Sequence, residues 1–195
     1  KYFAKYYKQK RTFEALSELI QETADEIRYL ESVSNSLDIA LSEADLGQIK
    51  EELTASGYVR RKFTKKKVKL TNKPMHYISS DGYDIYVGKN NIQNDELTFS
   101  FANGGDWWFH AKGAPGSHVI VKTNGDELPD RTFEEAGRLA AYYSKNRGSD
   151  KVEIDYIEKK HVKKPNGAKP GFVVYYTNYS LVIDSDISNI KVVQD

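Results

Sequence analysis

The sequence predicts an α+β protein, in which a long coiled-coil helix precedes a compact mixed domain with a mostly antiparallel sheet and a packed helix. Two patterns predict this division. Apolar residues recur at helical spacing over residues 1–45, whereas short alternating segments separated by turn residues begin near Met75. One later segment, residues 132–146, returns to helical spacing and supplies the helix expected to pack on the sheet.

The first segment carries a heptad pattern that no Pro or Gly interrupts. Its seam consists of Tyr2, Tyr6, Gln9, Phe13, Leu16, Ile20, Thr23, Ile27, Leu30, Ser34, Leu37 and Leu41. Steps of four and three alternate along it, which is typical of a left-handed coiled coil. At about 1.5 Å per residue, the helix is roughly 60 Å long and needs a partner along its seam. Because the sequence starts at Lys1 and looks like a fragment, we expect the partner to be a preceding segment or a second copy of the chain.

The chain divides into three parts. Residues 1–57 form the coiled-coil arm, in which a short helix over 44–55 follows the long one and Gly57 is a plausible stop. Residues 58–74 form a basic linker, and residues 75–195 form the α+β domain. The linker cations, with no acid among them, are Arg60, Arg61, Lys62, Lys65, Lys66, Lys67, Lys69 and Lys73.

Within the domain, alternating segments predict strands at 77–79, 84–87, 107–111, 118–122, 152–159, 172–176 and 181–183. The turn 80–83 joins the first two strands as a hairpin. Thr132 and Glu135 have the spacing of a capping box at the start of the packed helix. The pattern of residues 90–101 is ambiguous.

Several classes of site and of protein are excluded or disfavoured. The absence of Cys excludes disulfides and Cys-ligated metal sites, and the spacing of the four His residues matches no metal motif. No apolar run reaches roughly 18 residues and no leader pattern is present, so we expect no membrane span and a cytoplasmic protein. Ser117 and His118 are adjacent on a strand and point to opposite faces, so they form no catalytic dyad. We expect no catalytic residue, no metal and no cofactor.

Two segments of the domain favour RNA binding. In the run from residue 106 to 119, Trp108, His110 and Lys112 share one strand face, which combines stacking surface with positive charge; Ser117 and His118 follow. The alternative is that this face packs inside the protein. The second segment is a Pro- and Gly-containing loop suited to a phosphate backbone, with the alternative of an ordinary solvated loop. Its cations are Lys159, Lys160, Lys163, Lys164 and Lys169.

The start of the long helix mixes aromatic and basic side chains that fall outside the seam. These are Phe3, Tyr7, Lys8, Lys10 and Arg11. Exposed aromatics beside cations at the end of a coiled coil suggest a docking tip for RNA or protein. The alternative is that they cover a helical corner whose other half lies outside this chain.

Four stretches carry a resemblance to a known family. They are SSDGYDIYVGKNN (79–91), DWWFHAKGAPGSHVIVK (106–122), EEAGRLAAYYSK (134–145) and VKKPNGAKPG (162–171). In this order they resemble the NFACT-R domain, and the helix with YFAKYYKQKR and IRYLESV resembles the returning strand of the coiled-coil arm in the same family. The resemblance covers nearly the whole chain and identifies it as similar to the C-terminal part of the RqcH, NEMF and fibronectin-binding protein A family.

The resemblance implies a ribosome-associated quality control factor. Family members bind the large ribosomal subunit and tRNA and support untemplated tailing of stalled nascent chains, with alanine in the bacterial members. The ribosome itself performs peptide transfer, so no catalytic residue is required. The resemblance also leaves an alternative open, a surface adhesin that binds fibronectin, because bacterial members were first named for that activity.

Overall fold

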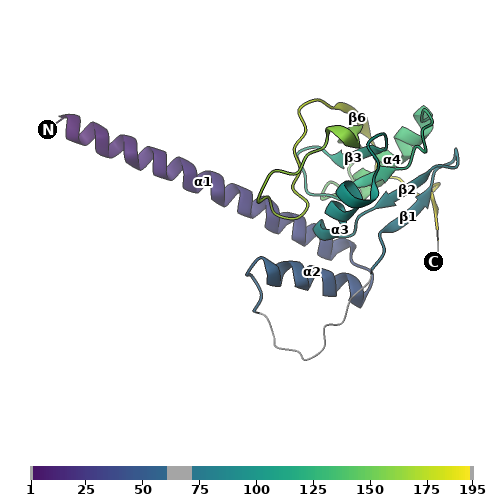
Figure 1. Cartoon of the computed structure of the whole chain (residues 1–195), viewed down its shortest axis with the longest axis horizontal. Helices are drawn as coiled ribbons and strands as arrows, with labels where there is room; N and C mark the ends of the chain where they lie inside the picture. Colours follow the sequence, from purple (N-terminus) through teal and green to yellow (C-terminus); the bar gives the residue numbers. More distant parts are fainter. Residues whose placement is uncertain (1, 61–71, 194–195) are drawn as a thin grey trace.

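The structure is a computed structural model that describes residues 2–60 and 72–193 (Figure 1). A long helix extends from an α+β domain, as the sequence predicts, and a second helix returns beneath it. Most of the predicted basic linker lies outside the described residues. The helical elements are α1 (Tyr2–Ile39), α2 (Glu43–Ala55), α3 (Asn91–Asp95), a π-helical turn (Glu96–Phe101), α4 (Asp130–Tyr142) and a 3-10 turn (Lys159–His161). The strands are β1 (Met75–Ile78), β2 (Asp84–Val87), β3 (Trp107–Ala111), β4 (Val119–Val121), β5 (Val152–Glu158), β6 (Tyr179–Ile183) and β7 (Lys191–Val192).

These strands form one seven-stranded sheet in the order β6-β5-β3-β4-β2-β1-β7, and every neighbouring pair is antiparallel. The expected antiparallel sheet is therefore confirmed. β3 lies in the interior of the sheet, where Trp107 is opposite Val121 of β4 and Glu158 of β5. Because β6 pairs only with β5 among the described strands, it forms one edge.

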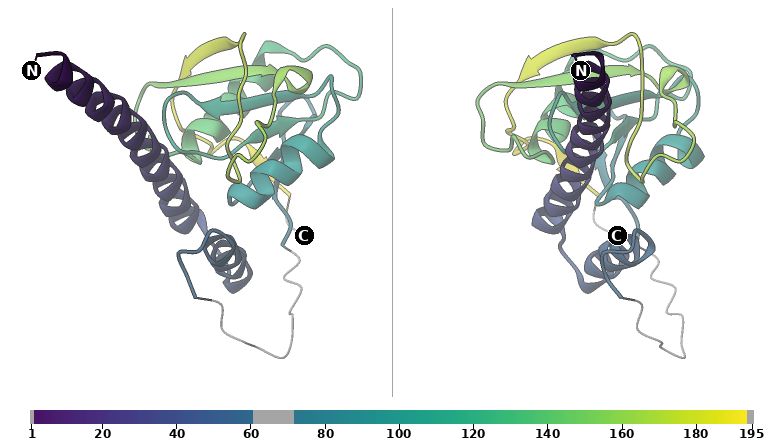
Figure 2. Two further views of the ribbon diagram at one scale, coloured as in Figure 1. Left: turned by 60° about the vertical axis from the view of Figure 1, so that its left-hand side comes forward. Right: turned by 90° about the vertical axis from the view of Figure 1, so that its left-hand side faces the viewer.

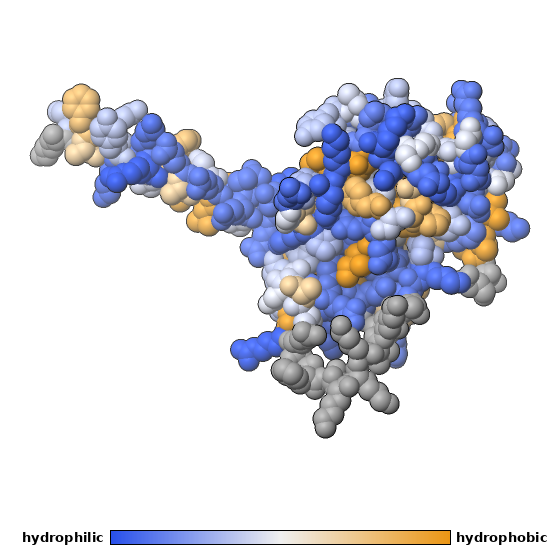
Figure 3. Space-filling view, in the orientation of Figure 1, coloured by the Kyte–Doolittle hydropathy of each residue, from blue (hydrophilic) through white to orange (hydrophobic). Residues whose placement is uncertain are grey.

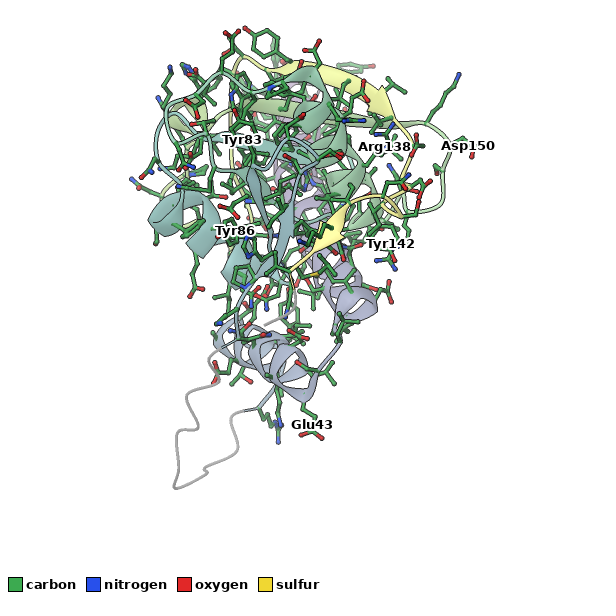
Figure 4. All side chains as sticks on the ribbon, turned by 90° about the vertical axis from the view of Figure 1, so that its right-hand side faces the viewer. Glu43, Tyr83, Tyr86, Arg138, Tyr142 and Asp150 are labelled. Carbon is green, nitrogen blue, oxygen red and sulfur yellow. The ribbon has the colours of Figure 1, made fainter. Side chains whose placement is uncertain are left out.

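The two faces of the sheet are covered differently. Helix α4 packs on one face and buries apolar residues, such as Ala136 and Leu139, against Phe109 and Val121. Arg138 of α4, labelled in Figure 4, forms an ion pair with Asp184, which joins α4 to the segment after β6. The other face carries a smaller cluster, which the π-helical turn and the loop after β5 cover: Leu97, Ala102, Trp108, Ile120, Ile157 and Val162.

The long helix uses separate faces for the domain and for its seam. Near its C-terminal end, Tyr29 and Val33 pack against Ile49 of α2, while Ile39 enters the core below the sheet. The seam residues from Tyr2 to Leu41 stay exposed, with Ile20 68% exposed. Figure 2 shows the arm projecting away from the domain, and Figure 3 shows apolar residues along it. Within the described residues the predicted seam has no partner.

Buried amide side chains fix the arm to the domain. Asn91, at the start of α3, donates to the Ser32 hydroxyl of α1 (2.8 Å) and to the Glu52 carboxylate of α2 (2.9 Å). The Gln48 side-chain oxygen accepts from Asn90 and Gln93, each at 2.8 Å. All of these amides are buried, so breaking any of these bonds would leave a polar group without water or a partner. We call Gln48, Glu52, Asn90, Asn91 and Gln93 the amide cluster.

Two local predictions are wrong, and one strand was missed. Thr132 and Glu135 form no capping box, because α4 begins earlier with Pro129 as its N-cap. Thr132 instead donates to Asp81 (2.9 Å) and the Glu135 carboxylate accepts from the Ser80 N–H (2.8 Å), so both residues hold the β1–β2 turn. Residues 172–176 form no strand and pair only through the bridge between Lys163 and Val174. The short strand β7 was not predicted.

We predict that the exposed seam drives self-association of this chain. Ile20→Glu places a charge on the seam and should shift sedimentation toward the monomer, because a buried unpaired charge opposes pairing. Leu19→Glu is the matched control, since Leu19 is 56% exposed but lies outside the seam. A wild-type chain that sediments as a clean monomer at tens of micromolar would contradict this prediction.

A second prediction concerns Glu52. Burial raises the pKa of this carboxyl, and the charge of Asp95 adds to the effect, although the bond from Asn91 opposes it. The folded state therefore binds the proton more tightly than the unfolded state, and stability falls as pH rises through the ordinary value of 4.5 toward the raised pKa. Glu52→Gln keeps an acceptor for Asn91 and should stabilise the protein at neutral pH more than below pH 4.5.

Urea unfolding at the two pH values measures the effect. The exposed neighbour Glu51 supplies the control Glu51→Gln, which should show no such pH dependence. Equal shifts for the two variants at both pH values would rule out a role for buried charge at Glu52.

Candidate nucleic-acid interface

The face of β3 expected to contact RNA is largely internal. Trp108 is 0% exposed and lies against Tyr175 (5.2 Å between ring centroids) and His118 (5.2 Å). Ser117 and His118 are each 1% exposed. The sequence prediction of direct contacts by these three residues is therefore corrected, because the loop after β5 and the π-helical turn cover them. A base cannot stack on a ring that protein already surrounds.

The two histidines of this region are not cations at neutral pH. Burial lowers the pKa of His110 to about 4. Burial also lowers the pKa of His118 well below its ordinary value, and a positive charge on His110 would lower it further. His118 Nδ1 lies 2.8 Å from the Thr98 hydroxyl, and the two imidazole rings meet edge to face at 5.5 Å. Neutral, paired imidazoles support the loop above them and attract no phosphate.

Lys112, the third residue of the predicted face, is exposed at the end of β3. Its ammonium pairs with the Glu153 carboxylate across to β5, and this hydrogen bond raises the pKa of Lys112. The charge is thus available at the surface but partly neutralised by its neighbour. The structure places Lys112 away from the buried Trp108 and His118.

The basic loop of residues 159–171 is anchored at both ends of its turn. Lys164 donates to the Asp95 carboxylate (2.6 Å) and to the Lys169 carbonyl (2.8 Å). The N–H of Gly171 also donates to Asp95 (3.1 Å), and Gly171 has φ +79°, a conformation that favours glycine. A Cβ at Gly171 would meet the Asn91 side chain at 2.5 Å. The loop is therefore held close to α3 and the amide cluster.

Two loop lysines contact other parts of the protein. Lys164 holds the loop, and Lys169, although exposed, lies over the Tyr29 ring of the arm at 4.3 Å. Lys160 and Lys163 are exposed, with Lys160 paired to Glu158, whereas half-buried Lys159 lies 5.9 Å from the Phe99 ring. Lys159, Lys160 and Lys163 thus form the outward cationic surface, which is the arrangement that a phosphate backbone requires.

The predicted docking tip lies at the far end of the arm (Figure 1). Phe3 and Tyr7 are exposed there, and Tyr7 contacts Tyr6 edge to face. Lys8 is exposed, Lys10 pairs loosely with Glu14 (3.9 Å), and the Arg11 guanidinium donates to the Tyr7 carbonyl (3.4 Å). These residues share one end of the helix but do not lie near the basic loop, so the two sets are separate surfaces.

Sequence patterns missed the amide cluster. The run of residues 90–94 holds four amide side chains, which neither helical nor strand periodicity explains. This excess of amides could have predicted a buried polar cluster, because each amide in a compact domain needs several hydrogen-bond partners. Within residues 2–60 and 72–193, no group of three His, Asp or Glu side chains could hold a metal ion. No helix in the same ranges has the length and apolarity to span a membrane.

The match of the domain to a family model places it in an RNA-binding class, carried here on a helical arm. Residues 73–177 match the family model described as "NFACT protein RNA binding domain", and residues 1–72 match "NFACT N-terminal and middle domains". The chain belongs to the NFACT family, which includes the ribosome quality control proteins RqcH and NEMF.

Among its relatives, the Rqc2 homolog RqcH of Streptococcus suis is 46% identical over 98% of this chain. The human ribosome quality control complex subunit NEMF is 37% identical over 40% of this chain and 7% of its own length. The chain spans 34% of the length of the first of these. The solved C-terminal part of the fibronectin/fibrinogen-binding protein from S. suis superposes with a TM-score of 0.88 at 45% identity, over 97% of this chain and 77% of that one.

The half-buried His110 predicts a pH dependence of stability. Its folded-state pKa of about 4 lies below the ordinary value of 6.5, so the unfolded state binds the proton first as pH falls. Stability should therefore be lost between these two values, by on the order of 3 kcal/mol for this group. His110→Gln should flatten that part of the profile in urea unfolding, whereas His161→Gln, at an exposed histidine, should not.

The quantity to compare is the slope of the free energy of unfolding against pH. The absolute stability of His110→Gln is not compared. A profile that is the same for wild type and both variants would show that His110 titrates normally.

Proposed function

We propose that this chain is the arm and RNA-binding domain of a ribosome-associated quality control factor. In this proposal it binds the large ribosomal subunit and tRNA, and it supports untemplated alanine tailing of stalled nascent chains in the cytoplasm. The observation that carries the RNA-binding part is the outward cationic surface of Lys159, Lys160 and Lys163. It lies within the residues that match the RNA-binding family model.

The proposed role assigns no catalytic residue to this chain, because the ribosome performs peptide transfer. The chain would act by positioning, with the basic loop on RNA and the tip residues Phe3, Tyr7, Lys8, Lys10 and Arg11 on the ribosome. The exposure of both surfaces supports this division. The rigid attachment of the arm through the amide cluster supports it too, since a hinge there would not hold the two surfaces in a set relation.

Binding to fibronectin is the second candidate, and its motive is the name of the solved S. suis relative. The two functions differ in their response to salt. Binding to RNA phosphates weakens steeply as salt rises, because counterions are released on association. Saturable binding to fibronectin that added tRNA does not inhibit would favour the adhesin function.

For RNA binding, we expect Lys159→Ala/Lys163→Ala to weaken tRNA binding by roughly tenfold at low salt. It should also reduce the slope of log affinity against log salt by about one for each phosphate that the variant no longer neutralises. Filter binding across a salt series measures both quantities.

The matched control is Lys151→Ala/Lys191→Ala, which removes two exposed lysines at other places on the sheet. Lys151 precedes β5 and Lys159 follows it, so they are separated by the length of the strand, about 23 Å. Equal weakening by the two double variants would mean that net charge alone accounts for the binding. Absence of tRNA binding at low salt would remove the proposed function.

A further inference from the structure

A ladder of stacked aromatic rings crosses the sheet and ends at its edge. Phe109 of β3 stacks on Tyr156 of β5 (5.5 Å between centroids, 16° between planes). Tyr156 in turn stacks on Tyr179 of β6 (5.5 Å, 28°). Each pair is directly opposite across neighbouring strands, so the backbone register sets the stack. The rings pass from fully buried Phe109 to Tyr179, which is 61% exposed.

The exposed end of the ladder borders a hollow of about 420 Å³. Trp107 and Tyr179 supply aromatic walls, with 6.2 Å between their ring centroids. Glu158, His161, Thr177 and Asn178 supply polar groups around them. This size lies within the range of about 300–1,000 Å³ that small-ligand pockets occupy, and it exceeds what one planar heterocycle needs.

Charged groups of both signs border the hollow. Glu158 and His161 lie at the two sides of Lys159 and Lys160 in the chain, and Lys160 pairs with Glu158. The segment that lines the hollow at Glu158 and His161 therefore also carries Lys159 and Lys160 of the outward cationic surface. An aromatic platform beside cations that track phosphates is the arrangement by which proteins hold single-stranded nucleic acid.

We propose that this hollow is a subsite for one unpaired base of an RNA strand, which stacks on Tyr179 against the Trp107 wall. The base lies in the hollow beside the exposed end of the Phe109–Tyr156–Tyr179 ladder, and the adjoining phosphates lie on Lys159 and Lys163. The inference rests on the proposed RNA binding and adds where, and by what chemistry, a base is held. Burial of the inner rings keeps Tyr179 in position, so little order is lost when the base binds.

The test uses the full chain with a short single-stranded RNA and with an abasic strand of equal length. Tyr179→Ala should weaken binding of the RNA about tenfold, within the range found for loss of one base–aromatic stack. It should leave binding of the abasic strand unchanged, because that strand keeps its phosphates. Tyr179→Phe keeps the ring and should bind the RNA like wild type.

Tyr176→Ala is the matched control, since Tyr176 is 84% exposed but does not line the hollow. Tryptophan fluorescence gives an independent readout: Trp107 borders the hollow and Trp108 is buried, so the RNA should quench the emission and the abasic strand should not. Circular dichroism establishes that each variant is folded.

RNA binding that Tyr179→Ala leaves unchanged, while Lys159→Ala/Lys163→Ala still weakens it, would overturn the subsite and spare the proposed function. Equal weakening of both strands by Tyr179→Ala would also overturn it, because a base contact cannot act on an abasic strand. Absence of binding to any RNA at low salt would overturn both proposals.

Discussion

The amide cluster between the arm and the domain is the interaction on which the shape of this protein depends. Asn91 joins α1 and α2 through Ser32 and Glu52, while Gln48 receives bonds from both Asn90 and Gln93. An apolar contact alone, such as that of Tyr29 with Ile49, would tolerate sliding of one helix over another. Buried amides do not, because any shift leaves several donors unpaired at once. The cluster thus converts two helices and a domain into one body.

The Trp108 motif acts beneath the surface that it was expected to form. Trp108 and His118 make a buried support on which Val162 and Tyr175 of the covering segment rest. Because this support is neutral and packed, the lysines of the loop above it take defined positions while their charges remain outside. A strong sequence motif can therefore serve binding indirectly, by fixing the backbone that carries the contacting residues.

The sequence predicted those features that local periodicity determines. The heptads of α1, the hairpin of β1 and β2, and the strands β3, β5 and β6 all have such a local pattern. The pattern of β3 indicates that Trp107 and Trp108 point to opposite faces, but not which face is covered. That depends on a loop about fifty residues later, whose approach no local rule describes. The capping box predicted from the Thr132–Glu135 spacing was wrong for the same reason. The β1–β2 turn, which is distant in sequence, binds both side chains.

Contacts between the basic loop and the arm fix the two proposed binding surfaces relative to each other. Lys169 lies over Tyr29, and Lys145 of the domain pairs with Glu31, which is close to Tyr29 on α1. From Tyr29 the arm continues to Tyr2 over about 40 Å without a break. An RNA strand held by the loop would therefore fix where the arm tip points, and a partner on the tip would restrict which RNA the loop can reach. Coupling of this kind needs no conformational change, because the geometry is set before either partner binds.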